Sequence, residues 1–253
     1  MSEQNKPKFM DFVNVYDFTC VLPGSGETIQ FKPVSTGQIK KLLTYEKETN
    51  YVMQEQALDD LITSSILTEQ FNIDDLYIYD RLFLLVELRK KTKGEMLEFQ
   101  VTCPECNSQS LNKVNLDILE IKQLDASIDT TVTLGDGKIK VYLKHMTRRD
   151  QKKDIKPHFF PKNLTDMQRA YAFQVLFHAC AIDKIETPNG IDENLTIKDR
   201  MYFIEQIPMS EMEKLKDKVE EMGFGWKLEN KVKCLHCSFE YNELIPIQNN
   251  FFG

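Results

Sequence analysis

Two Cys-x-x-Cys motifs contain the residues of this chain whose type and spacing best suit chemistry. They comprise Cys103, Cys106, Cys234 and Cys237. Four thiolates are the ligand set of a tetrahedral structural zinc site, and a two-residue spacer lets both sulfurs of a pair face one ion. The interval 107–233 holds 127 residues, far more than the roughly 15–20 of a compact zinc ribbon. A shared ion would join two distant parts of the chain, which favours architecture over catalysis.

Other states of these cysteines stay open: separate disulfides or free thiols, redox pairs, and partial metal binding. A redox pair needs a thiol with a lowered pKa, for instance at a helix N-terminus, whereas both motifs here have strand-like flanks. The N-terminal residues lack the apolar segment of a signal peptide, and in a reducing cytosol such motifs are more often metal-binding. We therefore predict one structural zinc ion. His236, inside the second motif, is expected to be a bystander, and the charge of the site to be offset by Lys113, Lys231 and Lys233.

Composition places the chain among ordinary globular proteins. Its 253 residues are 42% hydrophobic and 28% charged, enough for one large domain or two small ones. The net charge of −7 argues against the broad basic field that nonspecific nucleic-acid binding requires. No apolar run reaches the roughly 18–20 residues of a membrane span.

No arrangement of residues predicts catalysis, so we expect a protein that is not an enzyme. Cys20 and Cys180 stand alone in apolar surroundings, where cysteine is usually a core residue. His178 lies on an apolar helix and is expected to be a core histidine with a satisfied hydrogen bond. The acidic pairs, such as Asp59-Asp60, and the basic run 148–153 are expected on solvated helix faces.

Turn signals and hydrophobic periodicity predict the elements. Strands and hairpins are expected at 13–22 with 29–33, 96–102, 111–119, 130–134 with 138–143, 226–233 and 239–244. Helices are expected from Ser35 or Thr36 to 48, then at 51–67, from 76 to a stop at Gly94, and at 164–182, 197–206 and 210–222. Ser210 with Glu213 predicts a capping box, and 186–194 a loop.

This order predicts an α+β fold rather than alternating βαβ units. It consists of an N-terminal hairpin with helices and small antiparallel strands that carry the two motifs of one zinc-ribbon-like site. A long helical insertion separates the motifs. We divide the chain into 13–95 (hairpin and helices), 96–146 with 224–244 (motif strands) and 147–223 (helical insertion).

Three stretches together resemble a known family. They are the segment 28–33 with the helix after it, the segment 80–95 (DRLFLLVELRKKTKGE), and the two cysteine motifs with their strands. The pattern resembles the baseplate hub subunit and hub-assembly protein family of T-even-like contractile-tailed bacteriophages. The resemblance implies a non-enzymatic protein that contacts other tail and baseplate hub proteins. It implies assembly in the host cytoplasm and leaves retention in the virion tail open.

Two groups of residues that we expect to be exposed are candidate contacts with partner proteins: the C-terminal aromatic pair and the start of the basic run. A terminal aromatic pair, Phe251-Phe252, suits a partner groove, although it can equally fold back on its own core. Arg148 and Arg149 begin the best local anion-binding patch. The alternative function is a zinc-ribbon nucleic-acid-binding or transcription-associated regulator, for which Trp226 and the nearby lysines give limited support.

Overall fold

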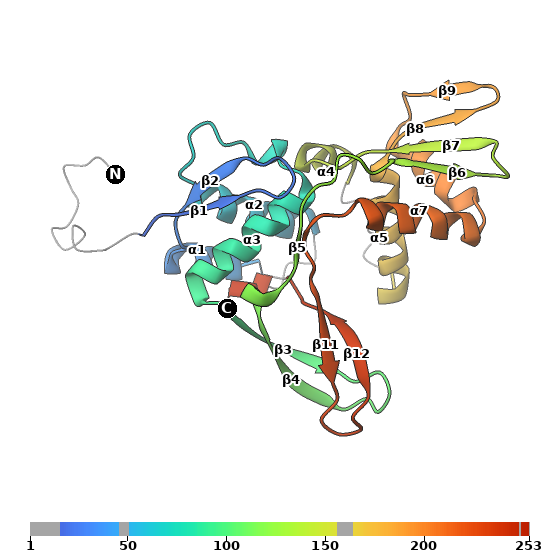
Figure 1. The fold of residues 1–253 in the computed structure, drawn as a ribbon. Coiled ribbons are helices and arrows are strands. Elements are labelled where there is room, and N and C mark those ends of the chain that lie inside the picture. Colours follow the sequence, from blue (N-terminus) through green and yellow to red (C-terminus); the bar gives the residue numbers. More distant parts are fainter. Residues whose placement is uncertain (1–15, 46–50, 156–163, 248, 253) are drawn as a thin grey trace.

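The computed structural model describes residues 16–45, 51–155, 164–247 and 249–252, and has the α+β fold that the sequence predicts (Figure 1). Its α-helices are α1 Thr36–Leu43, α2 Tyr51–Ser65, α3 Ile78–Lys93, α4 Arg148–Asp154, α5 Asp166–Ala181, α6 Ile197–Gln206 and α7 Met209–Met222. Short 3-10 helices are η3 Ile73–Asp75, η4 Leu116–Ile118 and η6 Asn249–Phe252. No helix among the described residues has the length and apolar character needed to cross a membrane.

The strands form small antiparallel sheets. They are β1 Phe18–Val21, β2 Thr28–Phe31, β3 Met96–Thr102, β4 Gln109–Asn115, β5 Ile121–Lys122, β6 Thr131–Leu134, β7 Ile139–Leu143, β8 Ile182–Thr187, β9 Gly190–Asp192, β10 Gly225–Trp226, β11 Glu229–Lys233 and β12 Glu240–Leu244. The described strands make one four-stranded sheet, in the order β6-β7-β8-β9. They also make the two-stranded pairs β1-β2, β3-β4, β5-β10 and β11-β12.

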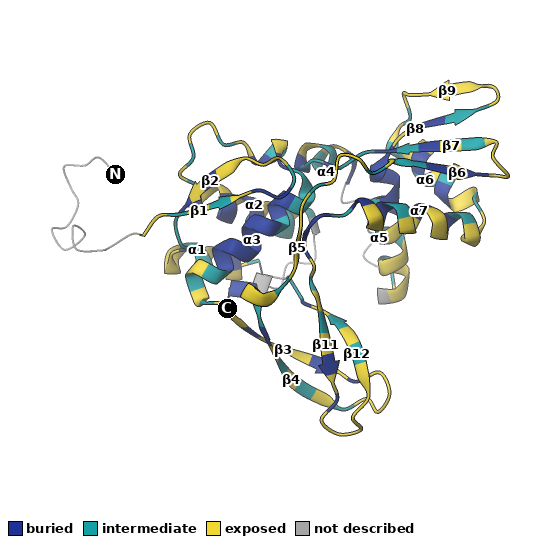
Figure 2. Cartoon of the chain, viewed as in Figure 1, coloured by how far each residue is buried: buried dark blue, intermediate teal, exposed yellow. Residues whose placement is uncertain are grey.

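Helix α3 is the centre of what we call the helical lobe, residues 18–45, 51–93 and 249–252. Figure 2 shows buried residues along much of this helix. Apolar residues such as Phe83, Leu84 and Leu88 are 5% exposed or less, which confirms the expected core helix. It ends where predicted, at Gly94, whose φ of 88° suits glycine.

A buried carboxylate fastens the first hairpin to α3. Asp80 is fully buried and accepts hydrogen bonds from the backbone N–H groups of Gly24 and Ser25, at 2.7 and 3.1 Å. A Cβ at Gly24 would lie 2.5 Å from a ring carbon of Phe224, so this turn requires glycine. The hairpin predicted at 13–22 with 29–33 is present over β1 and β2, with its turn at residues 23–26. The hydrogen bonds to Asp80 hold this turn against α3.

The C-terminal residues lie inside the helical lobe. Phe251 and Phe252 are 4% and 1% exposed and belong to the core cluster that contains α3. Arg89 donates to the carbonyl oxygens of Phe251, Gly94 and Met96, at 3.0, 2.5 and 2.9 Å. The expectation of an exposed aromatic tail is therefore wrong, because these rings fill the protein's own core.

The second body, the sheet lobe, comprises residues 131–143 and 166–222. In Figure 1 the four-stranded sheet lies on one side and helices α5, α6 and α7 cover its other face. The inward residues of the strands and helices form one core, including Val141, Ile182 and Leu215. Buried Arg200 bonds Asp154 at 2.7 Å and the carbonyl oxygen of Ile182 at 3.0 Å. These bonds connect the end of α4 to the junction between α5 and β8.

Two expectations for this lobe fail. The segment 186–194 is not simply a loop, because β8 and β9 form a hairpin in which Thr187 pairs with Gly190 and Pro188-Asn189 make the two-residue turn. Helix α7 starts at Met209 after Pro208 and not at a Ser210 cap. Pro208 occupies the N-cap position, with φ of −58° and ψ of 150° and no side-chain cap hydrogen bond, so Ser210 lies inside the first turn.

The third part, the cysteine arm, comprises residues 96–115 and 229–244. Hairpins β3-β4 and β11-β12 project together from the body in Figure 1. The hairpin β6-β7, which we grouped with the motif strands in 96–146, instead packs in the sheet lobe through Val132, Leu134 and Val141. That boundary is corrected accordingly, because β7 pairs with β8.

The burial of the terminal rings predicts a stability effect. Replacing Phe252 by alanine should lower the free energy of unfolding by about 3–5 kcal/mol, because it leaves a cavity in the core. Urea unfolding followed by circular dichroism measures this change. The control is Tyr202→Ala at a ring that is 65% exposed on α6, expected to cost little. Equal effects of the two substitutions would contradict the packing described here.

Candidate metal centre

The two Cys-x-x-Cys motifs form turns of the same shape. In the first, the N–H of Asn107 donates to the carbonyl oxygen of Cys103 at 2.9 Å. In the second, Ser238 donates to that of Cys234 at 3.0 Å. Asn107 and Ser238, which follow the second cysteine of each motif, have φ values of 55° and 61°. The left-handed backbone conformation of this residue reverses the chain directly after each pair of cysteines. Both sulfurs of a pair therefore point the same way.

The four sulfurs of the two turns meet. The Sγ atoms of Cys103 and Cys237 are 3.7 Å apart, and those of Cys106 and Cys234 are 3.6 Å apart. All four atoms lie within 4.8 Å of one another. Each close pair joins one motif to the other across the gap of 127 residues. The structure thus brings together all four predicted ligands.

The donor set fits a tetrahedral thiophilic ion. Four sulfurs about 2.3 Å from a central ion would be separated by about 3.8 Å, close to the two short sulfur–sulfur distances. Sulfur ligands select ions such as Zn²⁺ or Cu⁺ rather than Mg²⁺ or Ca²⁺. Among the described residues, the cluster is the group of metal-ligating side chains close enough to hold an ion.

The surroundings give the four thiols unequal proton affinities. Ser108 bridges the motifs, with its hydroxyl oxygen 3.0 Å from Cys106 Sγ and 3.4 Å from Cys234 Sγ. The Ser108 hydroxyl and the backbone N–H groups of Cys237 and His236 lower the pKa of Cys234 to about 5. At Cys237 a backbone N–H lowers the pKa, but desolvation and the neighbouring sulfurs outweigh it and raise it to about 12. Adjacent acids divide their protons in this way, and a bound cation would release them.

The remaining cysteines and histidines do not join this centre. Burial raises the pKa of both Cys20 and Cys180 to about 12, which makes them inert core thiols. His178 is 6% exposed and its Nδ1 lies 2.7 Å from the carbonyl oxygen of Gln174, so the core histidine expected there is confirmed. Of the lysines expected near the cysteines, Lys113 pairs with Glu98 and Lys233 with Glu240.

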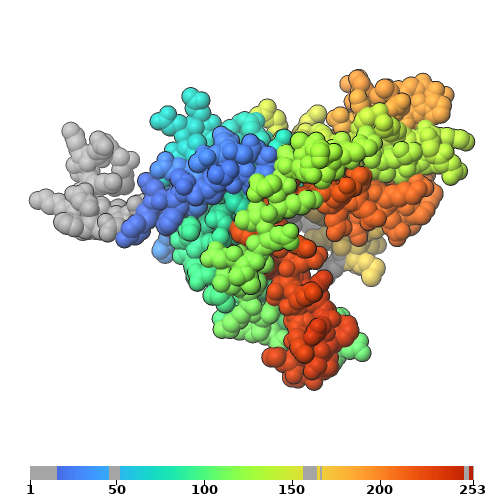
Figure 3. Space-filling model, in the orientation of Figure 1, coloured from blue at the N-terminus to red at the C-terminus, as the bar shows by residue number. Residues whose placement is uncertain are grey.

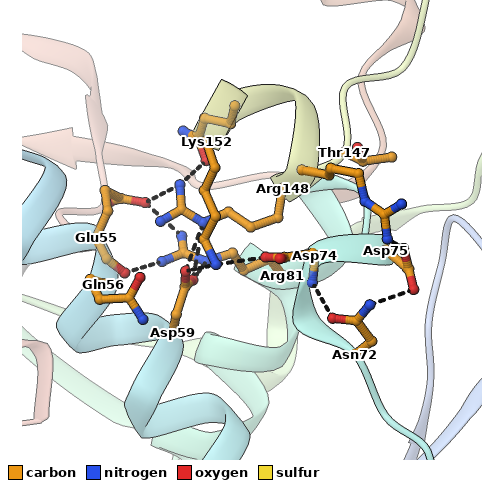
Figure 4. Close-up of polar contacts among 12 residues, drawn as sticks. Glu55, Gln56, Asp59, Asn72, Asp74, Asp75, Arg81, Thr147, Arg148 and Lys152 are labelled. Carbon is orange, nitrogen blue, oxygen red and sulfur yellow. Dashed lines mark hydrogen bonds and ion pairs between the residues drawn. The ribbon is translucent and has the colours of Figure 1, made fainter. Parts of the chain in front are cut away.

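A second polar cluster, which we call the Asp59 network, lies between α2, α3 and α4 (Figure 4). Asp59 is 1% exposed and binds Arg81 at 2.7 Å, Arg148 at 2.9 Å and Lys152 at 3.1 Å. Glu55 also pairs with Arg81, at 2.9 Å. Burial alone raises the pKa of Asp59, but the two guanidinium groups outweigh it and hold the pKa below its usual range.

This network corrects two expectations. Asp59 is not on a solvated face, and Arg148, expected at an exposed anion-binding patch, is 4% exposed within the protein. Arg149 does lie at the surface, where it pairs with Asp75. A signal for the network was present in the sequence. The apolar residues of segment 76–91 are too dense for a surface helix, and charged residues such as Arg81 in a buried helix need partners.

The chain is thus an α+β protein with a cluster of four cysteines that could hold a metal ion. A family model described as T4 bacteriophage base plate protein matches residues 14–253. The chain belongs to this family. No curated protein and no solved structure gives a significant match.

Family membership fixes the broad function. The chain is a baseplate protein of a T4-like bacteriophage, which supports a structural role in the virion tail and contacts with other baseplate components. The family resemblance identified from the sequence is confirmed at this level.

The Asp59 network predicts a pH-dependent effect on stability. Asp59→Asn should lower the free energy of unfolding by about 3–5 kcal/mol at neutral pH, because it leaves buried cations uncompensated. The lowered pKa of Asp59 means that its contribution is complete above the unfolded pKa of about 4 and is lost as pH falls through the folded value. The difference between variant and wild type should therefore shrink in acid. Urea titrations across the acidic range measure it.

The neighbouring residue provides a matched control. Asp60 is exposed and pairs with Lys41 at the surface, so Asp60→Asn should cost at most about 1 kcal/mol. An Asp59→Asn penalty that is small, or independent of pH, would contradict the role of the network.

Proposed function

We propose that the chain is a protein of the central hub of the phage tail baseplate, either a structural subunit or an assembly factor. The observation that carries this proposal is the family match over residues 14–253. The resemblance of segment 80–95 and of the motif strands to hub proteins supports the narrower assignment. The role is one of contact rather than catalysis, with other tail and hub proteins as partners. Assembly takes place in the host cytoplasm.

We also propose that the cysteine centre binds one structural zinc ion. Zn²⁺ accepts four thiolates in a tetrahedron without redox chemistry, and the sulfur–sulfur distances suit that geometry. The ion would cross-link the two hairpins of the cysteine arm. The N–H of His236 points to Cys234 Sγ at 3.4 Å, so this residue contributes its backbone while its ring stays outside the ligand set. The sheet lobe is then an insertion between the two halves of the site.

The zinc proposal predicts the metal content of the purified protein. The chain prepared without chelators should contain one zinc ion, and Cys103→Ser or Cys234→Ser should each abolish that content, because three thiolates bind far more weakly than four. Inductively coupled plasma mass spectrometry measures the ion. His236→Ala is the control and should retain it. Wild-type zinc content in either cysteine variant would refute the shared site.

The hub proposal predicts the partners. A tagged chain recovered from infected cells without chelator should carry tail and baseplate proteins in stoichiometric amounts, identified by mass spectrometry. Recovery with the tag alone is the control. Analysis of purified virions then separates the two roles, because a structural subunit is present in the particle and an assembly factor is absent.

A different result would reverse the order of the hypotheses. Recovery of RNA polymerase or nucleic acid in place of tail proteins would reject the hub assignment. It would favour the zinc-ribbon regulator.

A further inference from the structure

A hollow lies where the three parts of the molecule meet. It is a groove of about 600 Å³ whose walls come from the start of α3, the end of α7, β5, β10 and the base of the cysteine arm. Figure 3 shows the green segment around β5 lying against the red segment that follows α7. A hollow of this size is typical of a binding site.

The groove is apolar inside. Phe224, Trp226, Leu228 and Leu244 line it, and Leu244 is 68% exposed although it is a large aliphatic residue. The indole of Trp226 is fixed, since it stacks on Phe83 with ring centroids 5.6 Å apart and has the Lys90 Nζ 4.9 Å from its centre. The walls are therefore preorganised to receive an apolar side chain.

Two hydrogen-bond donors in the groove walls lack partners in the described part of the chain. Trp226 is 8% exposed, and its buried Nε1 has no hydrogen-bond partner. No hydrogen bond is found for the hydroxyl of Tyr79 either. Burial, followed by the Glu220 carboxylate, raises the pKa of Tyr79, so that hydroxyl keeps its proton. Of the two, only Trp226 Nε1 is a buried unsatisfied donor, which is rare because it costs about 1–3 kcal/mol. The hydroxyl of Tyr79, a half-buried residue, is free to donate to an acceptor of an occupant.

The rim of the groove is acidic once its ion pairs are considered. Lys227 pairs with Glu120 at 3.9 Å, and Lys122 donates to the carbonyl oxygen of Glu221 at 2.5 Å. Glu220 and Glu229 also line the groove, and neither has an ion pair among the described residues. Lys122 keeps its charge because its partner is a neutral carbonyl, so three glutamates against two lysines leave the lining with a net charge of −1, which complements a basic ligand.

From these features we propose that the groove binds an extended segment of another protein, in which an apolar side chain lies next to lysine or arginine. The apolar side chain enters beside Trp226 and Leu244. A backbone carbonyl oxygen of the segment accepts from the Tyr79 hydroxyl, and its basic residue faces Glu220 and Glu229. The proposal rests on the hub assignment only for the expectation that this segment belongs to a tail protein.

A peptide selection tests the recognition chemistry directly. The full zinc-containing chain is used to select from a library of short randomised peptides, and synthetic copies of the enriched sequences are titrated. Trp226 is the single tryptophan, so its fluorescence reports occupation of this groove. We expect enriched peptides with an apolar residue beside lysine or arginine, and a saturable change in emission.

Variants of exposed residues locate the binding. Leu244→Arg should lower the affinity for the peptides at least tenfold, and Glu229→Lys should lower the affinity for the basic peptides. Leu111→Arg, on the arm outside the groove at a residue that is 56% exposed, should not. Equal affinity in all variants, no enrichment, or enrichment of acidic peptides would overturn the proposal. If peptides fail while tail proteins are still recovered from infected cells, the groove is rejected and the hub assignment stands. If peptides bind and no tail protein is recovered, the groove proposal stands and the hub assignment is rejected.

Discussion

The structure depends on closing a very long loop at four sulfur atoms. Hairpins β3-β4 and β11-β12 belong to separate two-stranded sheets, and a lone hairpin is only marginally stable in water. Apolar residues along both hairpins, up to Val101 and Val232 beside the motifs, belong to the main core cluster, and the four cysteines meet at the tip of the arm. Loop-closure entropy grows slowly, so closing 127 residues costs only roughly 2 kcal/mol more than closing about 15. A whole lobe can therefore be inserted between the two motifs.

Helix α3 organises the remainder through charges that it buries. Asp80 holds the first hairpin, Arg81 enters the Asp59 network, and Arg89 binds carbonyl oxygens that include one from the C-terminal residues. Each of these groups would be costly if it were buried alone. Because the partners Gly24, Asp59 and Phe251 come from distant segments, the polar contacts specify one arrangement of segments that apolar packing alone would leave less defined.

Local patterns in the sequence predicted the features that local physics determines. The capping residues Ser35 and Thr196, the stop at Gly94 and the strand 96–102 lie where periodicity and turn chemistry place them. The four cysteines were also identifiable, since their spacing is short within each pair. The partners of Asp59 and the burial of Phe252 were not predictable, because both depend on contacts with residues far away in the sequence. The two-residue strands β5 and β10 carry too few residues for any periodic signal.

The cysteine centre and the Asp59 network connect different parts of the molecule. The helical and sheet lobes each have a core of their own, whereas the tip of the arm depends on the sulfurs. Loss of an ion from the cysteines would therefore loosen the arm and leave both lobes folded, while loss of the Asp59 network would weaken the contact of α4 with the helical lobe. The groove has Leu228 and Leu244 from the arm side and Tyr79 from α3. Its shape therefore follows the position of the arm, which makes the cysteine centre a determinant of the surface that the body presents to other proteins.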